Sequence, residues 1–154
     1  MIEHPKDIEY FTDYPAPIME LIHSAHFTNI NSTITFFGPM MYFLARAICA
    51  ERILEIGHAE GYTAFYLANA VKDTGIRFQC SSNCRYYGID IAKTEDLRKI
   101  LEDRNLPATI IKKDSLSLAP DDFEGIIFDI IFQVGCHDAE HILHELKVLY
   151  PKLK

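Results

Sequence analysis

Short apolar runs alternate with helical patterns along most of the chain. Strands are predicted at 52–56 (RILEI), 86–91 (YYGIDI), 109–114 (TIIKKD) and 126–134 (IIFDIIFQV). Helices are predicted at about 62–72, 94–105 and 137–150, where apolar residues recur at helical spacing. Strands that alternate with helices predict parallel pairing through right-handed crossovers. The predicted fold class is therefore α/β, with a doubly wound, mostly parallel, Rossmann-like sheet.

The chain before the first predicted strand has a different pattern. Residues 1–35 are predicted to be a helical extension, because two prolines precede a segment at 18–25 with one apolar helical face. Another helix is predicted to begin near Pro39. Its buried stripe is expected to comprise Met40, Phe43, Leu44, Ala47 and Ile48.

Composition narrows the class of protein. A chain of 154 residues suits one domain with a hydrophobic core. The net charge of -7 argues against nucleic acid as a partner, since no basic cluster is present to neutralise phosphates. No run reaches the ~18 apolar residues that a membrane span needs, and the N-terminus has no signal-peptide pattern. A cytoplasmic location and no membrane partner are therefore expected.

A glycine-punctuated turn (HAEGYT) follows the first predicted strand. Gly57 and Gly61 let the backbone pass close to a ligand, and the helix start that follows exposes amides that favour an anion or a carboxylate. Asp90 ends the second strand, where a carboxylate accepts both hydroxyls of a ribose. Asp114 and Ser115 end the third strand and are placed to contact an adenine edge. These features predict a nucleoside site.

The nucleoside is not expected to belong to a dinucleotide. That fingerprint requires glycines at 57, 59 and 62, and the chain has Ala59 and Tyr62. A dinucleotide oxidoreductase is therefore the disfavoured alternative.

The stretch ILEIGHAEGYTAFYLA resembles the first motif of class I S-adenosylmethionine-dependent methyltransferases, above all the small-molecule O-methyltransferases related to catechol O-methyltransferase. YYGIDI resembles their second motif. FDIIFQVGCHDAEHILHELKVLYPKLK resembles their fourth strand and the helix after it. The resemblance covers residues 36–154. It implies S-adenosylmethionine as cofactor and methyl transfer to a small-molecule acceptor, with oxygen as the expected nucleophile.

The resemblance also assigns roles to individual residues. It implies a cofactor site formed by Glu55, Gly57, Gly61, Tyr62, Thr63, Asp90, Ile91, Asp114 and Ser115. In this set Glu55 and the glycines shape the pocket for the methionine portion, and Thr63 binds its carboxylate. Ile91 packs on the adenine. His137 is the candidate general base, because an unperturbed imidazole titrates near neutral pH.

The chain departs from the family pattern in ways that bear on metal binding. Val134 stands where metal-dependent members have an aspartate, and valine cannot bind Mg²⁺, so no metal site is predicted. A zinc site built from His137, His141 and His144 with Cys136 or Glu140 is the alternative for the histidine cluster. An ordinary polar helix face is favoured over it, since no HEXXH-like spacing is present.

Other departures leave the function open between two classes. The chain has four of the seven strands that its relatives usually have, so its fourth strand would be an open edge. Either the methyltransferase-like domain at 36–154 is incomplete at its C-terminus, or another copy of the chain covers this edge. Together with Val134, Cys136 and Glu60, the missing strands favour a catalytically silent cofactor-binding or scaffold protein. The glycine turn, Asp90 and His137 favour the methyltransferase. Asp114 could equally be a turn cap and His137 a helix-start residue.

Overall fold

The structure is a computed structural model that describes residues 37–92 and 94–154. The predicted helical extension at 1–35 lies outside the described residues. The main elements are α3 (Phe37–Ala47), β1 (Arg52–Ile56), α4 (Tyr62–Phe78), β2 (Arg85–Asp90), α5 (Thr94–Asp103), β3 (Ala108–Lys112), β4 (Ile130–Gln133) and α6 (Ala139–Leu149). Short 3-10 turns lie at Ser115–Ser117, Pro120–Phe123 and Tyr150–Lys152. Among the described helices, none is long and apolar enough to cross a membrane.

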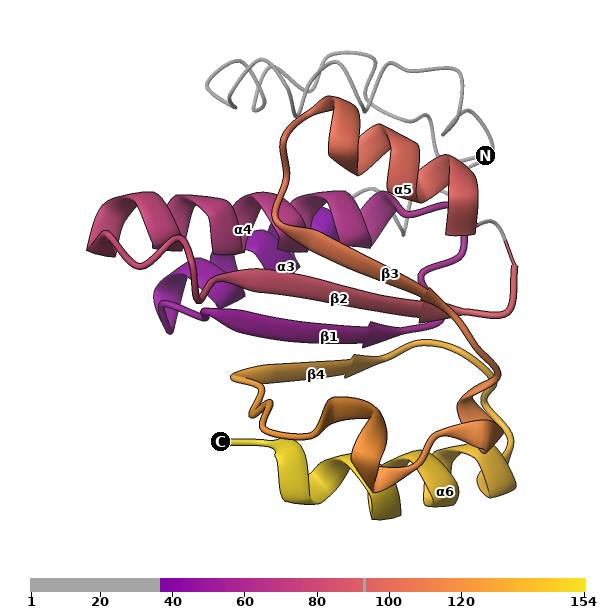
Figure 1. The fold of residues 1–154 in the computed structure, drawn as a ribbon. Helices are drawn as coiled ribbons and strands as arrows, with labels where there is room; N and C mark the ends of the chain where they lie inside the picture. The colour runs from indigo at the N-terminus through magenta and orange to yellow at the C-terminus, as the bar shows by residue number, and fades with distance from the viewer. Residues whose placement is uncertain (1–36, 93) are drawn as a thin grey trace, which may run out of the picture.

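The four described strands form one parallel sheet in the order β3-β2-β1-β4. The chain adds β2 and β3 on one side of β1, and then returns to place β4 on the other side (Figure 1). The strand order therefore reverses at β1, and ligands in such sheets lie at the carboxyl ends of the strands beside that point. The sheet confirms the predicted fold class.

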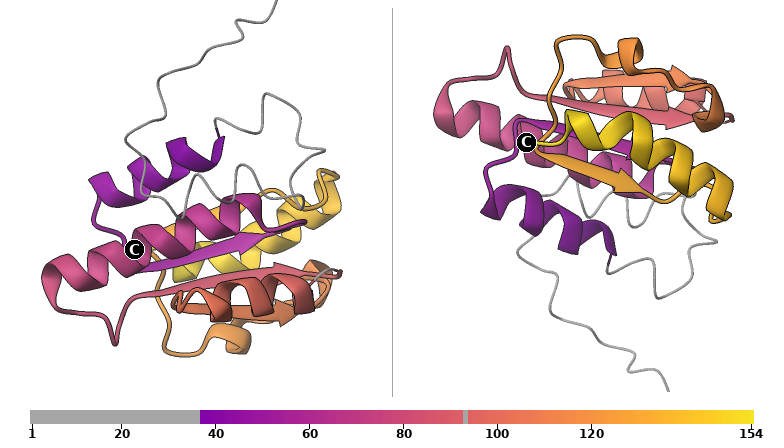
Figure 2. Two further views of the ribbon diagram at one scale, coloured as in Figure 1. Left: turned by 90° about the horizontal axis from the view of Figure 1, so that it is seen from above. Right: turned by 90° about the horizontal axis from the view of Figure 1, so that it is seen from below.

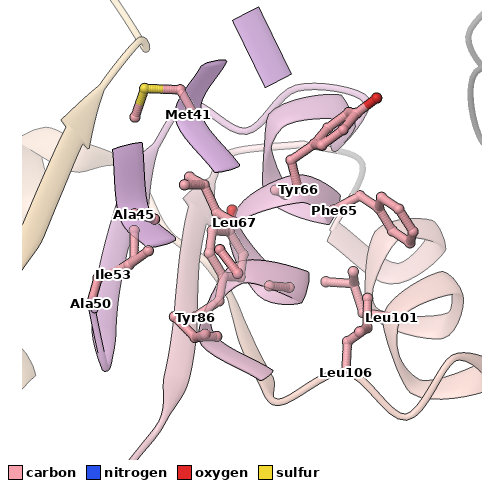
Figure 3. Packing of buried hydrophobic residues seen from close by; sticks show 14 of the residues in the cluster. Met41, Ala45, Ala50, Ile53, Phe65, Tyr66, Leu67, Tyr86, Leu101 and Leu106 are labelled. Carbon is pink, nitrogen blue, oxygen red and sulfur yellow. The ribbon is translucent and has the colours of Figure 1, made fainter. Parts of the chain in front are cut away.

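Helices cover both faces of the sheet. α4 and α5 lie on one face with α3 beside α4, and α6 lies on the other face (Figures 1 and 2). Two buried clusters result. The larger lies beneath α4 and includes Phe65, Tyr66 and Tyr86 (Figure 3), and the smaller includes Leu54, Phe128 and residues of α6. Strands buried on both faces explain why the predicted strands read as continuous apolar runs.

The predicted buried stripe of α3 is wrong. Gly38, Pro39, Met41 and Ala45 are buried, whereas the predicted stripe of Met40, Phe43, Leu44, Ala47 and Ile48 is exposed. Small residues decide the contact, because a Cβ added at Gly38 would lie 2.4 Å from Cδ2 of Tyr66 in α4. The helix therefore packs through the face that allows the closest approach.

α4 is longer than predicted, and β4 is shorter. α4 continues through Gly75 to Phe78, beyond the predicted end near residue 72, and contacts with α3 hold its extension. Tyr42 donates to Asp73 at 2.6 Å, and Arg46 donates to Thr74 at 2.8 Å. The predicted fourth strand began at residue 126, but Phe128 instead forms a parallel bridge with Leu153. β4 is one edge of the described sheet, and all four of its residues are half-buried.

Candidate functional site

Two cavities lie side by side at the carboxyl ends of the strands. The first, the Asp90 cavity, has a volume of about 360 Å³ and is lined by the ends of β1 and β2 and by the segments that follow all four strands. The second, the Glu55 cavity, has a volume of about 340 Å³ and lies beside the first turn of α4. Gly57, Ala59 and Val134 line both cavities and so form a shared wall. The two cavities are thus adjacent and separated by residues of the glycine turn and by Val134.

The glycine turn adopts a conformation that its glycines make accessible. Gly57 and Gly61 have φ of +85° and +87°, in the left-handed region that side chains disfavour. Gly61 is the N-cap of α4, and a Cβ there would lie 2.3 Å from a methyl carbon of Leu97. The turn therefore presents backbone, not side chains, at these two positions.

Asp90 is tied to the glycine turn. Its Oδ2 accepts a hydrogen bond from the amide of Ala59 at 2.9 Å, and its Oδ1 accepts one from the amide of Ala92 at 2.9 Å. The side chain is 13% exposed and lines the Asp90 cavity. Because each carboxylate oxygen has more than one lone pair, two oxygens held in this way still have capacity for ligand hydroxyls.

The other predicted nucleoside contacts line the same cavity. Ile91 is 66% exposed there, and Ser115 is buried. Asp114 also lines the cavity, but its Oδ1 accepts from the amide of Leu116 at 3.0 Å. Asp114 is therefore a turn cap, which was the alternative for this residue, and it contributes to the cavity wall as well.

The Glu55 cavity combines aromatic walls with a buried acid. Tyr62 and Thr63, the first two residues of α4, line it, and the rings of Phe37 and Phe132 stack beside it at 5.4 Å. Glu55 is 1% exposed and accepts a hydrogen bond from the Tyr86 hydroxyl at 2.5 Å. Burial raises the pKa of Glu55 to about 7, against the opposing effect of the Tyr86 hydrogen bond. The acid is therefore poised to gain or lose a proton near neutral pH.

The structure does not bring His137 into this site. His137 is exposed and is absent from the lining of both cavities, so its role as general base stays a prediction. One helical turn later, His141 does line the Asp90 cavity. Its Nδ1 lies 2.8 Å from Asp138, whose carboxylate caps α6, and this hydrogen bond raises the pKa of His141.

The three histidines of the zinc alternative are separated. His144 contacts the carbonyl of Leu118 at 3.0 Å, away from His141 and Asp138. In the described part of the chain, a close group of potential metal ligands is formed instead by Cys136, Asp138 and His141, within 4.8 Å of one another. Their mutual hydrogen bonds are those of a capped helix start.

Sequence reasoning missed His58. The predicted site gives it no role, yet it is 3% exposed and lines the Glu55 cavity. Its position inside the glycine turn was the available signal, because residues 57–60, 62 and 63 line one cavity or both, whereas Gly61 lines neither.

A family model described as a methyltransferase domain matches residues 54–154, and the chain belongs to this family. The matched region begins within β1 and includes the glycine turn and the ends of all four strands. A search of curated proteins gives no significant match.

Solved structures share the fold. An O-methyltransferase from Bacillus cereus in complex with SAH is 20% identical, with 91% of this chain and 64% of that chain covered and a TM-score of 0.64. A methyltransferase from Geobacter sulfurreducens is 22% identical, with coverage of 94% and 70% and a TM-score of 0.63. The SAH-bound methyltransferase PaMTH1 from Podospora anserina is 18% identical, with coverage of 90% and 57% and a TM-score of 0.61. The chain thus spans about 57–70% of the length of these proteins.

Proposed function

We propose that this chain binds S-adenosylmethionine across the two cavities and transfers its methyl group to an oxygen nucleophile of a small-molecule acceptor. The observation that carries the proposal is the glycine turn between the cavities, with Asp90 held beside it by the Ala59 amide. Family membership and the ligands named for the solved structures support the choice of cofactor.

The adenosine portion is assigned to the Asp90 cavity. Asp90 accepts the ribose hydroxyls, Ile91 packs on the adenine, and Asp114 with Ser115 contacts the adenine edge. Ser115 is buried in the wall and Ile91 is exposed over it, so a flat ring between them has one polar and one apolar neighbour.

The methionine portion is assigned to the Glu55 cavity. Thr63 and the amides at the start of α4 bind its carboxylate, because a helix N-terminus carries unpaired N–H groups and a partial positive charge. Glu55 also lines this cavity and contributes an acceptor for the amino group.

The protein has two chemical tasks in this proposal. The bound cofactor supplies an activated methyl group, so the chain must hold the acceptor oxygen in line with the sulfur–methyl bond and remove its proton. Phe37 and Phe132 form the apolar wall of the Glu55 cavity against which the acceptor is expected to lie. His137 is kept as the proposed base.

A cofactor-binding protein without transfer activity is the second candidate. The exposed position of His137, outside both cavities, favours it. A cytoplasmic location, the exclusion of nucleic acid and membrane partners, and a homo-oligomer that covers the edge of β4 remain predictions under either candidate.

Calorimetric titration with S-adenosylmethionine and S-adenosylhomocysteine tests the proposal. We expect binding by the wild type and loss of binding in Asp90→Ala, with Asp103→Ala as the control that removes an exposed acid from the end of α5. Circular dichroism checks that each variant is folded. No binding at millimolar ligand would reject both candidates that depend on the cofactor. Turnover with a panel of hydroxyl-bearing acceptors then separates the enzyme from the silent binder.

A further inference from the structure

His58 is a buried titratable side chain for which the proposed reaction has no use. Its ring lies over Gly88, in the middle of β2, where the absence of a side chain leaves room for it. A Cβ added at Gly88 would lie 3.1 Å from Cδ2 of His58 and 2.8 Å from the Tyr86 hydroxyl. The imidazole therefore fills the space between the glycine turn and β2 that the absence of a side chain at Gly88 leaves.

The hydrogen bonds of His58 define its protonation state. Nδ1 lies 3.1 Å from the carbonyl of Ala59, and a carbonyl oxygen only accepts, so Nδ1 carries the proton. Nε2 is buried and has no hydrogen-bond partner among the described residues. A second proton on Nε2 would thus place an unpaired N–H and a charge in the interior.

Several titratable groups surround the imidazole. Glu55 of β1 and Tyr86 of β2 lie on the same face of the sheet, and Asp90 at the end of β2 lies 4.0 Å from Nδ1. Glu60 and Tyr62 of the turn line the same cavity. Burial lowers the pKa of His58, while the Ala59 carbonyl and Asp90 act in the opposite direction. The neutral imidazole is therefore the form that is favoured in this buried position.

We infer that His58 is a positioning residue for the proposed cofactor site: its neutral imidazole holds the glycine turn in the shape in which Ala59 donates to Asp90. The inference rests on the proposed function. Ala59 has a φ of +47°, an unfavourable conformation for a residue with a side chain, so the turn needs contacts that hold it. The contacts are the packing of the His58 ring over Gly88, which holds the turn against β2, and the Asp90 carboxylate, which accepts from the Ala59 amide.

Protonation of His58 would release these contacts. The charged ring would leave its buried position, the Ala59–Asp90 hydrogen bond would loosen, and the acid assigned to the ribose would lose its orientation. Cofactor affinity should therefore fall as the pH is lowered, by at most tenfold per pH unit, because one proton is involved.

Two variants distinguish the effect of the ring of His58 from the effect of its titration. His58→Phe keeps a ring over Gly88 but cannot titrate, and His58→Asn keeps a donor for the Ala59 carbonyl but removes the ring. Affinity for S-adenosylhomocysteine is measured by calorimetry from pH 8.5 to pH 5.5. We expect the wild type to weaken on acidification. His58→Phe should bind within about threefold of wild type at pH 8 and vary little with pH, and His58→Asn should bind at least tenfold more weakly throughout.

Glu55 titrates in the same cavity and is itself assigned to the amino group of the cofactor, so Glu55→Gln should weaken binding in every protein. The series is repeated in this background, and only the change of affinity with pH is compared. A pH dependence caused by His58 persists in that background and disappears in His58→Phe. The inference is overturned if His58→Phe retains the wild-type pH dependence, or if His58→Asn binds as tightly as wild type at pH 8.

A measurement without ligand keeps this inference separate from the proposed function. Amide hydrogen exchange at Ala59, followed by NMR, reports its hydrogen bond to Asp90. We expect protection in the wild type and in His58→Phe, and faster exchange in His58→Asn. Equal exchange in all three proteins overturns the positioning role. If the exchange rates follow the expected order and the wild type binds no S-adenosylhomocysteine, the proposed function fails and the role of His58 in the turn stands.

Discussion

Gly57 and Gly135 bring the turns after β1 and β4 into backbone contact. A Cβ added at Gly57 would lie only 2.3 Å from Cα of Gly135, and Val134 beside it donates its amide to the carbonyl of Ile56 at 2.9 Å. This contact forms the shared wall of the two cavities, because Gly57 and Val134 line both. Glycine is needed at position 57 for its positive φ and also for the space that it leaves.

Gly57→Ala tests whether space or backbone conformation matters more. Gly125 is the matched control, because it has a φ of +72° and a Cβ there would meet nothing within 4 Å. Gly125→Ala should lower the free energy of unfolding by about 1 kcal/mol through backbone strain alone. Gly57→Ala should lower it by about 3 kcal/mol or more, since overpacking is added to the strain. Urea unfolding measures both, and equal losses would show that the close approach to Gly135 is unimportant.

Glu55→Gln should stabilise the protein at alkaline pH. The folded-state pKa of Glu55 is raised to about 7, above its ordinary value of 4.5, so its stabilising effect is present below 4.5 and is lost as the pH rises through 7. Glutamine stays neutral and keeps an acceptor for the Tyr86 hydroxyl. We expect the variant to exceed the wild type by up to about 3 kcal/mol at pH 8, with a smaller difference at pH 5.

Urea unfolding at pH 5, 6, 7 and 8 gives the required curve. A difference between Glu55→Gln and wild type that does not change with pH would contradict the raised pKa. His58 changes the free energy of unfolding with pH in the opposite direction. Its pKa is lowered in the folded state, so the neutral form is favoured there and the free energy of unfolding falls as the pH drops below 6.5. The His58→Phe variant lacks this titration, so its unfolding curves report the effect of Glu55 without that of His58.

Asp129→Asn should destabilise the protein at pH 7 and have little effect in acid. Asp129 accepts hydrogen bonds from the amides of Glu51 and Arg52 at 2.9 and 3.0 Å, and from Lys154 at 3.1 Å. Burial alone would raise the pKa of Asp129, but these partners lower it overall. The stabilisation is therefore present above the unfolded-state pKa and is lost as the pH falls through the folded-state value.

The expected loss for Asp129→Asn is about 1–3 kcal/mol at pH 7, since hydrogen bonds to a charged group are replaced by weaker ones. Unfolding at pH 7 and pH 3 measures it. Lys154→Met is the control for the ion pair: the lysine side chain is 75% exposed, so its loss should destabilise the protein less than Asp129→Asn does. A larger loss of stability for Lys154→Met than for Asp129→Asn would show that the ion pair stabilises the fold more than the amide hydrogen bonds do.

Glu145→Met should raise the free energy of unfolding. Glu145 is 1% exposed, and neither carboxylate oxygen has a hydrogen-bond partner among the described residues. Methionine has a similar length and removes the buried polar group, so we expect a gain of about 1–3 kcal/mol in chemical unfolding. Glu140→Met, at an exposed position of the same helix, should change stability by less than about 1 kcal/mol. A loss of stability in Glu145→Met would indicate a partner for the carboxylate.

The parallel sheet could be predicted from sequence because its strands carry a local signal. Strands covered on both faces are apolar at consecutive positions, and β1, β2 and β3 were placed within about two residues of their observed bounds. The end of α4 could not be predicted in the same way. Its extension through Gly75 is held by Tyr42 and Arg46, which lie in another helix about 30 residues earlier.

The position of the site could also be predicted, since parallel strands bring their carboxyl ends to one edge. Asp90 and Asp114 line one cavity for this reason, although 24 positions separate them in the sequence. Their roles toward the cofactor remain to be tested. The helix that follows β4 was harder to interpret, because His137 precedes the N-cap of α6 and is exposed, whereas His141 in the first turn lines the cavity.

The sequence by itself determined the alternation of strands and helices, the glycine turn and the acids at the strand ends, because these features depend on neighbouring residues and on chain periodicity. Tertiary structure alone decided which face of α3 is buried, that Gly57 meets Gly135, and that His58 lies over Gly88. The physical reason is that burial depends on the space left by residues distant in the sequence. The absence of a side chain at Gly88 of β2 leaves room for His58, and this space exists only in the assembled sheet.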